Sequence, residues 1–330
     1  MQVENKISIA LATHNGDAYL ESQLVSFLKQ THLPDELIIF DDASTDMTVT
    51  ILQRFATIAP FTVKIYVNEN NLGYAQNFSK ALEMCSGDIV FLSDQDDVWH
   101  ADKIKMMLAR FKAAPSTQLV IHDLEYCKED LTPIGQTKIE RMEGIFNLQR
   151  DYVVGMATAI RKSFLKLCLP IPNYAGVAHD SWLHDCAFAV GKKTVMREVL
   201  ASYRRHSSNA TFSSNLNVDF VTTPDHFKKS ITSDTRLIKT KTVFDISSNL
   251  HLQWILRNKN FIIEEGYATK IEIDRFIAVL RHKIDIINRR KYICELSRLK
   301  RLIPIIDFYC IGGYASFSGW KSALKDLFLN

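Results

Sequence analysis

Three carboxylates follow an apolar run within four residues. The segment FLSDQDDVWH spans residues 91–100 and contains Asp94, Asp96 and Asp97. Like charges this close raise one another's pKa, so the cluster is costly unless a cation or hydrogen-bond donors balance it. One or two carboxylates can hold Mg²⁺ or Mn²⁺ and leave its other positions to water and substrate phosphates. An N-cap role explains Asp97 alone, but not the other two carboxylates.

Two further aspartates, Asp41 and Asp42, open the segment DDAST at residues 41–45. We expect one residue of this segment to cap the helix that begins near Asp46. The other aspartate can then accept a hydrogen bond from a nucleotide base or a ribose hydroxyl.

Two later segments also carry groups suited to chemistry. Asp180 lies in AHDSW, just before an expected helix, where an N-cap role and a functional role are equally good interpretations. The segment SYRRHSSN at 202–209 contains Arg204, Arg205 and His206. Arginine suits phosphate oxygens and an imidazole can complete a mixed metal site, whereas a solvated basic edge is the structural alternative.

Alternating apolar and amphipathic segments must position these residues. Strands are expected at 6–12, 36–41, 61–67, 88–94 and 117–123, with helices at 17–30, 46–58, 74–85 and 101–113. This order predicts an α/β fold with a mostly parallel central sheet. Ligands bind such sheets at the carboxyl ends of the strands, where this chain is polar and acidic, so a nucleotide with a metal is favoured over an apolar ligand.

The remaining chain changes character after about residue 206. A helix is expected at 181–190 and a strand at 193–206. Residues 207–215 have the composition of a linker, and helical periodicity follows to residue 330. Residues 221–330 carry 19 basic and 11 acidic side chains, whereas residues 1–220 carry 21 and 26. We therefore place a boundary at 215–216, between a main domain and a basic helical region.

The composition is that of a folded protein. The chain has 330 residues, of which 47% are hydrophobic and 23% charged, enough for one large domain and an appendage. The sequence shows no apolar run of membrane-spanning length and no secretory leader, and its six scattered cysteines fit free thiols. These features predict a cytoplasmic protein that at most touches a membrane surface.

The basic helical region has two interpretations. Its runs NRRK (288–291) and RLKR (298–301) can dock on anionic lipid headgroups. Alternatively, the region packs against the main domain or a second copy of the chain in a homo-oligomer, with residues 302–314 as its core. We expect no nucleic acid partner.

Several ordered motifs resemble one known family. The later motifs AHDSWL, GKKTV and YRRHSSN, together with residues 9–46 and 68–99, are similar to inverting glycosyltransferases of family 2, which have the GT-A fold. The resemblance covers residues 6–206 and is strongest to rhamnosyltransferase-like members that build bacterial surface polysaccharides, such as O-antigen or capsule. Family sequences often carry Tyr where His14 stands.

The resemblance implies how the sugar donor is bound. It divides 1–215 into a nucleotide-sugar half, about 1–100, and an acceptor half, about 101–215. The donor is a sugar linked to UDP, dTDP or GDP, and the acceptor is a glycan or a lipid-linked saccharide. The implied donor-binding residues are Thr13, Asn15, Asp41, Asp42, Asp94, Asp96 and Arg204.

The resemblance also implies the catalytic groups. Asp94 and Asp96 form the D-x-D pair of the family, and the implied ligands of Mn²⁺ or Mg²⁺ are Asp96, Asp97 and His206, with Asp96 as the first choice. Asp180 is the implied general base that takes a proton from the acceptor hydroxyl.

Three other functions fit the sequence less well. A sugar nucleotidyltransferase needs a phosphate loop rich in glycine and basic residues near the N-terminus, and ATHNGD at 12–17 is not one. A dinucleotide oxidoreductase needs G-x-G-x-x-G after the first strand. A non-catalytic glycan-binding or assembly protein with a decayed site would be expected to lose at least one of the carboxylates named above.

Overall fold

The structure is a computed structural model that describes residues 5–174, 176–207, 234–317 and 319–328. The chain divides into two compact units, Met1–Asp234 and Thr235–Asn330. The predicted boundary at 215–216 and most of the expected linker lie outside the described residues.

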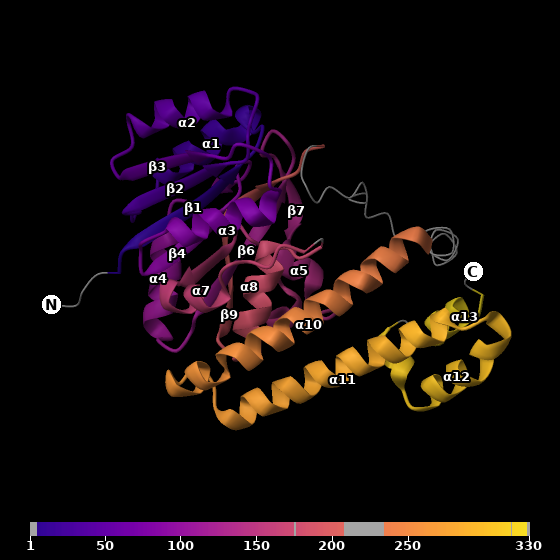
Figure 1. The fold of residues 1–330 in the computed structure, drawn as a ribbon. Coiled ribbons are helices and arrows are strands. Elements are labelled where there is room, and N and C mark those ends of the chain that lie inside the picture. The colour runs from indigo at the N-terminus through magenta and orange to yellow at the C-terminus, as the bar shows by residue number, and fades with distance from the viewer. Residues whose placement is uncertain (1–4, 175, 208–233, 318, 329–330) are drawn as a thin grey trace. The chain divides into compact units, whose positions relative to one another are not determined.

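The first unit is built on a nine-stranded sheet in the order β3-β2-β1-β4-β8-β6-β9-β5, with β7 paired to β6 (Figure 1). Its strands are β1 (Ile7–Thr13), β2 (Glu36–Asp41), β3 (Thr62–Val67), β4 (Ile89–Ser93), β5 (Val98–Trp99), β6 (Leu119–Cys127), β7 (Pro133–Thr137), β8 (Thr158–Arg161) and β9 (Lys193–Arg204). The four longest of the described ladders, β1–β2, β2–β3, β1–β4 and β6–β9, are parallel. The prediction of a mostly parallel sheet is confirmed.

Burial explains which strands are central. Every residue of β2 and β4 is buried, which is the pattern of strands covered on both faces. The edge strand β3 exposes Thr62, Lys64 and Val67 instead. The ladder between β6 and β9 contains two register shifts, between Ile121 and Glu125. Such irregularities change which side chains face the sheet surface.

Eight described helices belong to the first unit. They are α1 (Asp17–Leu28), α2 (Thr48–Ala56), α3 (Tyr74–Met84), α4 (Lys103–Ala113), α5 (Lys138–Met142), α6 (Leu148–Asp151), α7 (Lys162–Cys168) and α8 (His179–Ala189). Helix α3 packs on β1 and β2, and α8 packs on α3 (Figure 1). Helix α8 begins earlier than expected, so Asp180 lies inside its first turn rather than before it.

The expected cap of α2 is wrong. No residue of 41–45 caps this helix. Its N-cap is Met47, whose side chain makes no capping bond, and the backbone N–H of Thr48 is satisfied by Asp46 Oδ1 at 3.0 Å. Asp41 and Asp42 are therefore both available for other contacts.

The second unit is helical. It contains α10 (Asp234–Glu264), α11 (Lys270–Glu295), α12 (Arg298–Cys310), the 3₁₀ turn η1 (Gly313–Ser316) and α13 (Trp320–Phe328). Its core cluster consists of Ile286, Ile293, Ile305, Phe308 and Tyr314, with Phe317, Ala323 and Leu327 packed against it. Part of the expected core at 302–314 is therefore confirmed.

A buried ion pair joins α11 to α13. Arg290 donates two hydrogen bonds to Asp326, at 2.6 and 2.8 Å, and Tyr314 donates to the same carboxylate at 3.1 Å. Arg301 donates to the backbone carbonyls of Leu296 and Cys294. One arginine of each basic run is therefore held inside the unit.

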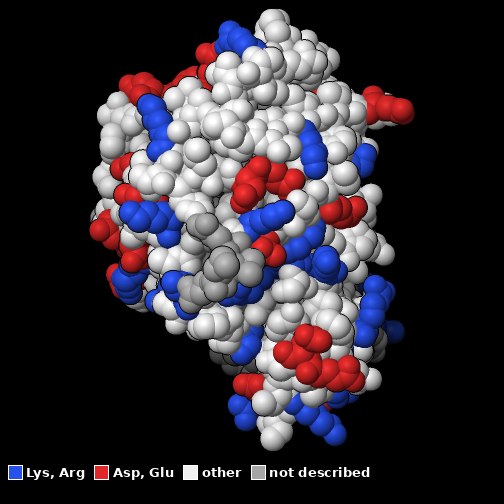
Figure 2. All heavy atoms as spheres, turned by 90° about the vertical axis from the view of Figure 1, so that its left-hand side faces the viewer, with Lys and Arg blue, Asp and Glu red and all other residues white. Residues whose placement is uncertain are grey.

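The described surface carries charges of both signs (Figure 2), and the cysteines form no disulfide. On the face shown in Figure 2, acidic and basic side chains lie interspersed. All six cysteines are free, and four of them are buried, as expected. Among the described helices, none combines the length and the apolar character needed to cross a bilayer.

Candidate active site

A cavity of about 560 Å³ lies at the carboxyl ends of β1, β2 and β4. Five of the predicted site residues line it: Thr13, Asp42, Asp94, Asp96 and Asp180. They come from segments far apart in the sequence: the parallel strands bring the first four to one edge of the sheet, and helix α8 supplies Asp180. The remaining predicted residues lie around or beneath this cavity.

Residues 94–97, here called the acidic loop, leave β4 and hold crowded carboxylates. Burial, together with the charges of Asp96 and Asp180, raises the pKa of Asp94 to about 8. Asp97 is almost fully buried, and its burial and the charges of Asp96 and Asp94 raise its pKa well above the usual range. At neutral pH and without a cation, Asp94 therefore carries a proton most of the time.

Asp97 corrects one prediction. Its side chain does not line the cavity, because Oδ1 accepts the backbone N–H of Arg204 at 3.1 Å and Oδ2 lies buried without a hydrogen-bond partner in the described part of the chain. The simple N-cap interpretation is also wrong, since the N-cap of α4 is Asp102. The Asp97 side chain is therefore turned away from the cavity and is not in a position to be a direct metal ligand.

A buried lysine under the acidic loop was not predicted. Lys103 is fully buried in the first turn of α4, where its ammonium donates to Met156 O at 2.6 Å and lies 3.5 Å from the centroid of the Trp99 ring. Burial lowers its pKa well below the usual range, against the opposing charges of Asp97 and Asp94. A lysine in the first turn of a helix opposes the helix dipole, and this was the signal in the sequence.

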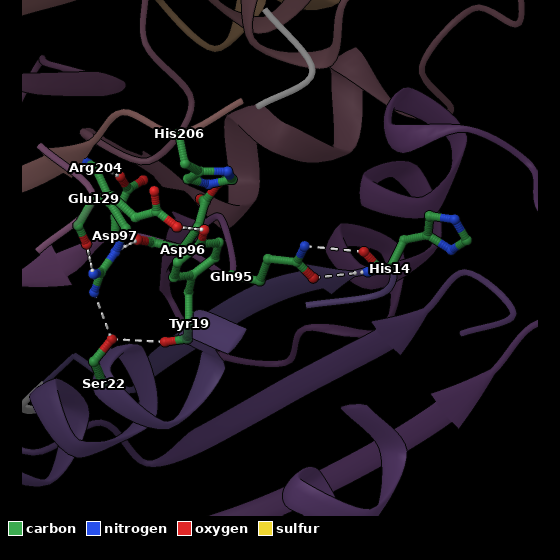
Figure 3. A network of polar contacts seen from close by, with 9 residues as sticks. All are labelled: His14, Tyr19, Ser22, Gln95, Asp96, Asp97, Glu129, Arg204 and His206. Carbon is green, nitrogen blue, oxygen red and sulfur yellow. Dashed lines mark hydrogen bonds and ion pairs between the residues drawn. The ribbon is translucent and has the colours of Figure 1, made fainter. Parts of the chain in front are cut away.

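Arg204 joins the acidic loop to two other segments (Figure 3). Its Nε donates to Asp96 O at 2.8 Å and its Nη2 donates to Ser22 Oγ at 2.8 Å. Its Nη1 donates to the backbone carbonyl of Glu129. The guanidinium is buried in these contacts and does not line the cavity, so the prediction that Arg204 binds the donor directly is corrected to a role in holding the loop.

His206 lies against the acidic loop (Figure 3). Its Nε2 lies 2.9 Å from Asp96 Oδ2, and its ring packs on Tyr19 with a centroid distance of 4.2 Å. The Tyr19 hydroxyl donates to Glu129 Oε1 at 2.6 Å, which fixes the ring. The structure therefore brings the predicted pair of Asp96 and His206 together, and Tyr19 orients the imidazole.

Asp94, Asp96 and His206 are the candidate ligands of a divalent cation. In the described ranges, no three His, Cys, Asp or Glu side chains converge on a preformed metal position. Mg²⁺ and Mn²⁺ usually take only one or two carboxylates and complete their shell with phosphates and water. The raised pKa of Asp94 marks a crowded pair that a cation would relieve, so Asp94 and Asp96, with His206 beside them, fit such an ion.

Asp42 organises the loop that follows β3. It accepts the backbone N–H groups of Leu72 and Gly73, each at 2.8 Å, and the side-chain amide of Asn68 at 2.9 Å. Gly73 has a φ of +82°, which favours glycine. Because Asp42 also lines the cavity, its Oδ2 keeps capacity to accept one more hydrogen bond there.

Asp41 and Asn15 brace the cavity from outside. Asp41 accepts from Thr13 Oγ1 at 2.8 Å and from Ser44 N at 2.8 Å, and it is fully buried. Asn15, with a φ of +46°, accepts from Thr45 N at 2.9 Å. Neither side chain lines the cavity, so both predicted donor-binding roles are corrected to structural contacts.

A side-chain amide ties the first loop to the acidic loop (Figure 3). Gln95 Oε1 accepts the backbone N–H of His14 at 2.8 Å, and its Nε2 donates to His14 O at 3.0 Å. A Cβ on Gly16 would lie 2.3 Å from the same amide oxygen, so a larger residue there would displace the Gln95 side chain. This pairing holds the ends of β1 and β4 at a fixed separation.

Helix packing positions Asp180. The neighbouring His179 is buried and stacks on Phe78 of α3 with a centroid distance of 3.8 Å. Gly155 approaches so closely that a Cβ there would lie 2.7 Å from His179 Nε2. Within the described residues, the one hydrogen bond that the Asp180 carboxylate accepts comes from the backbone N–H of Ser181, at 2.7 Å, and the side chain lines the cavity. A carboxylate in that position can take a proton from a ligand.

Part of this chain matches a known protein family. The profile described as Glycosyl transferase family 2 matches residues 8–167. Residues 8–167 belong to glycosyl transferase family 2. This confirms the resemblance found in the sequence and places the chain among the glycosyltransferases.

Two relatives share the sequence over different lengths. An uncharacterized glycosyltransferase of Nostoc is 24% identical over 288 residues, which are 84% of this chain and 82% of that protein. A dTDP-rhamnosyl transferase of Shigella flexneri is 37% identical over 99 residues, 29% of this chain and 34% of that protein. The stronger identity is therefore confined to a short segment, and this chain spans only about a third of the Shigella protein.

A solved structure shares the fold. S. aureus TarS 1–349 in complex with UDP-GlcNAc gives a TM-score of 0.53 at 16% identity, over 92% of this chain and 86% of that one. At this identity the likeness concerns the fold alone, and it supports the predicted GT-A architecture with a helical region after it.

Proposed function

We propose that this glycosyltransferase moves a sugar from a nucleotide-diphosphate donor to a hydroxyl of a glycan or lipid-linked acceptor, with inversion and with the help of Mn²⁺ or Mg²⁺. The observation that carries the proposal is the single cavity lined by Asp42, the D-x-D carboxylates and Asp180. The relatives that carry names in bacterial polysaccharide synthesis support the class of product, and the short match to a dTDP-rhamnosyl transferase supports dTDP among the candidate nucleotides.

The donor would lie along the ends of β1, β2 and β4. Thr13 and Asp42 would contact the nucleoside, where Asp42 Oδ2 has room for one more donor. Asp94 and Asp96 would hold the cation, which would neutralise charge on the leaving diphosphate. His206 would keep Asp96 in place, and Arg204 would keep the whole loop in place.

Asp180 would act on the acceptor. As the acceptor oxygen bonds to the anomeric carbon, the bond from that carbon to the diphosphate oxygen breaks and the hydroxyl proton passes to the Asp180 carboxylate. Asp180 lies near enough to Asp94 for its charge to raise that pKa, so the base and the acidic loop can serve one bound donor. Packing of His179 against Phe78 keeps the base from moving.

The first test is thermal unfolding with UDP, dTDP and GDP, each with and without Mn²⁺. We expect one nucleotide to stabilise the protein only with the metal, by about 2.7 kcal/mol at a hundredfold excess over its dissociation constant. Asp96→Ala should abolish this shift, whereas Asp102→Asn, an exposed aspartate outside the cavity, should keep it. No shift with any nucleotide would contradict the proposal and favour a non-catalytic binding role.

A second variant separates binding from chemistry. Asp180→Asn should keep the nucleotide-dependent shift but slow sugar release from the cognate donor by about 10²–10⁴-fold, since general base catalysis has this size. The anomeric configuration of the released sugar, followed by NMR, tests inversion. Retention of configuration would contradict the mechanism.

A separate proposal concerns the partner of the second unit. One face of α12 is exposed and apolar at helical spacing: Leu299, Leu302, Ile303, Ile306 and Tyr309. Leu299 is 96% exposed and Ile303 71%, although Ile305 and Phe308 on the same helix are buried. Helix α13 exposes Trp320, Leu324 and Phe328, which are four residues apart.

Exposed basic residues accompany these apolar ones. Arg298, Lys300 and Lys321 are exposed, whereas Arg290 and Arg301 are engaged inside the unit. We infer that α12 and α13 dock on anionic lipid headgroups at the inner face of the cell membrane. Apolar side chains would enter the interface, and each nearby Lys or Arg would add about 1 kcal/mol.

Flotation with vesicles tests this docking. The full chain should bind phosphatidylglycerol vesicles at low salt and bind pure phosphatidylcholine vesicles much less. Ile303→Glu should abolish binding, whereas Val279→Glu, at another exposed apolar position on α11, should not. No binding at low salt, together with a dimer in solution that Ile303→Glu dissociates, would instead assign this face to a second copy of the chain.

A further inference from the structure

Two cationic side chains line the cavity and have no part in the mechanism above. Lys138 is the first residue of α5, and Arg205 follows β9 directly. Both line the same cavity as Asp180. The neighbouring Arg204 is buried beneath the acidic loop, so the two consecutive arginines face different environments.

Lys138 is held in an unfavourable position. Among the described residues, its ammonium makes one hydrogen bond, a long one of 3.4 Å to Val153 O. Burial lowers its pKa, which the charge of Asp180 opposes and the charge of Arg205 reinforces. Because Lys138 and Arg205 line the same cavity, an anionic ligand there could contact both cations, and the arrangement is suited to such a ligand.

Two aromatic side chains line the cavity together with these cations. Tyr126 and Tyr203 also line it and meet edge to face, with ring centroids 5.8 Å apart. The guanidinium of Arg205 lies 6.0 Å from the Tyr203 ring, and its backbone N–H donates to Cys127 O at 2.9 Å. Rings of this kind offer flat apolar surface beside the cations, which suits a sugar ring that carries a charged group.

The location separates these cations from the donor's diphosphate. The carboxylates whose charge acts on Lys138 are Asp180 and Asp123, whereas those that act on Lys103 are Asp97 and Asp94. Among charged groups, the proposed base Asp180 therefore acts most strongly on the pKa of Lys138, and both side chains line the same cavity. A group bound at Lys138 and Arg205 would lie on the acceptor's side of the cavity.

We propose that Lys138 and Arg205 form a subsite for an anionic group of the acceptor, a phosphate or a carboxylate close to the hydroxyl that Asp180 deprotonates. This inference rests on the proposed function, because it names the acceptor class of the same site. The anionic group can belong to a phosphate linker or to an acidic sugar. Arginine and lysine bind both groups through charge-assisted hydrogen bonds.

Binding of two small probes to the full chain tests the subsite. Phenyl phosphate represents the linker and glucuronate represents the acidic sugar. Each is titrated by calorimetry, first into the protein alone and then into the protein saturated with its nucleotide and Mn²⁺. We expect saturable binding of at least one probe in both conditions, and the tighter probe identifies the source of the anionic group.

Variants complete the test. Lys138→Met and Arg205→Gln should each raise the probe's dissociation constant at least tenfold, whereas Lys128→Gln, an exposed lysine next to Cys127, should not change it. Arg205→Lys should retain part of the binding. The nucleotide-dependent thermal shift should stay within twofold in every variant, which also shows that each variant is folded.

Two outcomes would overturn the subsite. If neither probe binds the wild-type protein, the cations do not recognise an anion of this kind. If the variants lose nucleotide binding instead, Lys138 and Arg205 hold the donor's diphosphate. Failure of the proposed function has a different signature, because no nucleotide would then bind while the probes can still be measured on the protein alone.

Discussion

The cavity carries crowded carboxylates at one end and two neighbouring cations at the other. At the acidic loop, burial and neighbouring carboxylates raise the pKa of Asp94 to about 8. At the other end, burial lowers the pKa of Lys138, and Arg205 adds a like charge. Each end is unfavourable by itself, and a cation at the first and an anion at the second would relieve it. Both ends are therefore suited to ligands of opposite charge.

Two consecutive arginines give the largest expected contrast. Arg204→Met should destabilise the protein by about 3 kcal/mol, because it removes the guanidinium that donates to the backbone carbonyls of Asp96 and Glu129 and leaves these acceptors unsatisfied. Arg205→Met should cost less stability than Arg204→Met, because the Arg205 side chain lines the cavity rather than being held beneath the acidic loop. Urea unfolding of both variants measures the difference, and equal losses would contradict the assignment of Arg204 as the residue that holds the acidic loop.

A glycine tests whether the base depends on helix packing. Gly155→Ala would place a Cβ 2.7 Å from His179 Nε2 and should cost about 1–3 kcal/mol through overpacking. It should also slow sugar transfer while leaving nucleotide binding unchanged, because His179 adjoins Asp180 and not the donor side. Thermal unfolding and turnover give the two values. Loss of nucleotide binding would show that the two ends are not independent.

Neutralising the acidic end should stabilise the protein without its ligands. The folded pKa of Asp94, about 8, lies above its unfolded value, so the folded state binds more protons and stability falls as pH rises from 4 to 8. Asp94→Asn removes this loss, and its gain should grow over that range to about 1 kcal/mol or more. A gain that does not depend on pH would contradict the shifted pKa.

Removing the cation at the other end should give a smaller gain with the opposite pH dependence. Because the folded pKa of Lys138 lies below its unfolded value, the cost of burying it is full at neutral pH and disappears as pH rises toward about 10.4. Lys138→Met should therefore stabilise by about 1 kcal/mol or less at pH 7. Thermal unfolding between pH 7 and 10 checks that the gain shrinks.

The sequence predicted the residues at strand ends better than those that support them. Thr13, Asp42, Asp94 and Asp96 follow parallel strands, and the rule for such sheets places them together without any knowledge of packing. Lys103 and Lys138 were not predicted. The first-turn position of Lys103 was a local signal, but the contacts that make either lysine important depend on tertiary packing. Tyr19 likewise meets His206 only in the folded chain.

The sequence pattern did not show which of the two arginines, Arg204 or Arg205, faces the cavity. Successive residues of a strand point to opposite faces, so either Arg204 or Arg205 had to face the cavity. The sequence favoured Arg204, and the structure places Arg205 there. The register shifts between β9 and β6 change the alternation along the strand, and a shift of this kind has no signature in the sequence.

The contacts of Arg204 also limit how this enzyme can be re-engineered. One side chain joins the segments that contain Ser22, Asp96 and Glu129. A graft of residues 94–99 from a relative would therefore bring new backbone against three unchanged surfaces. Donor preference should be exchangeable between relatives only when all three segments are grafted together.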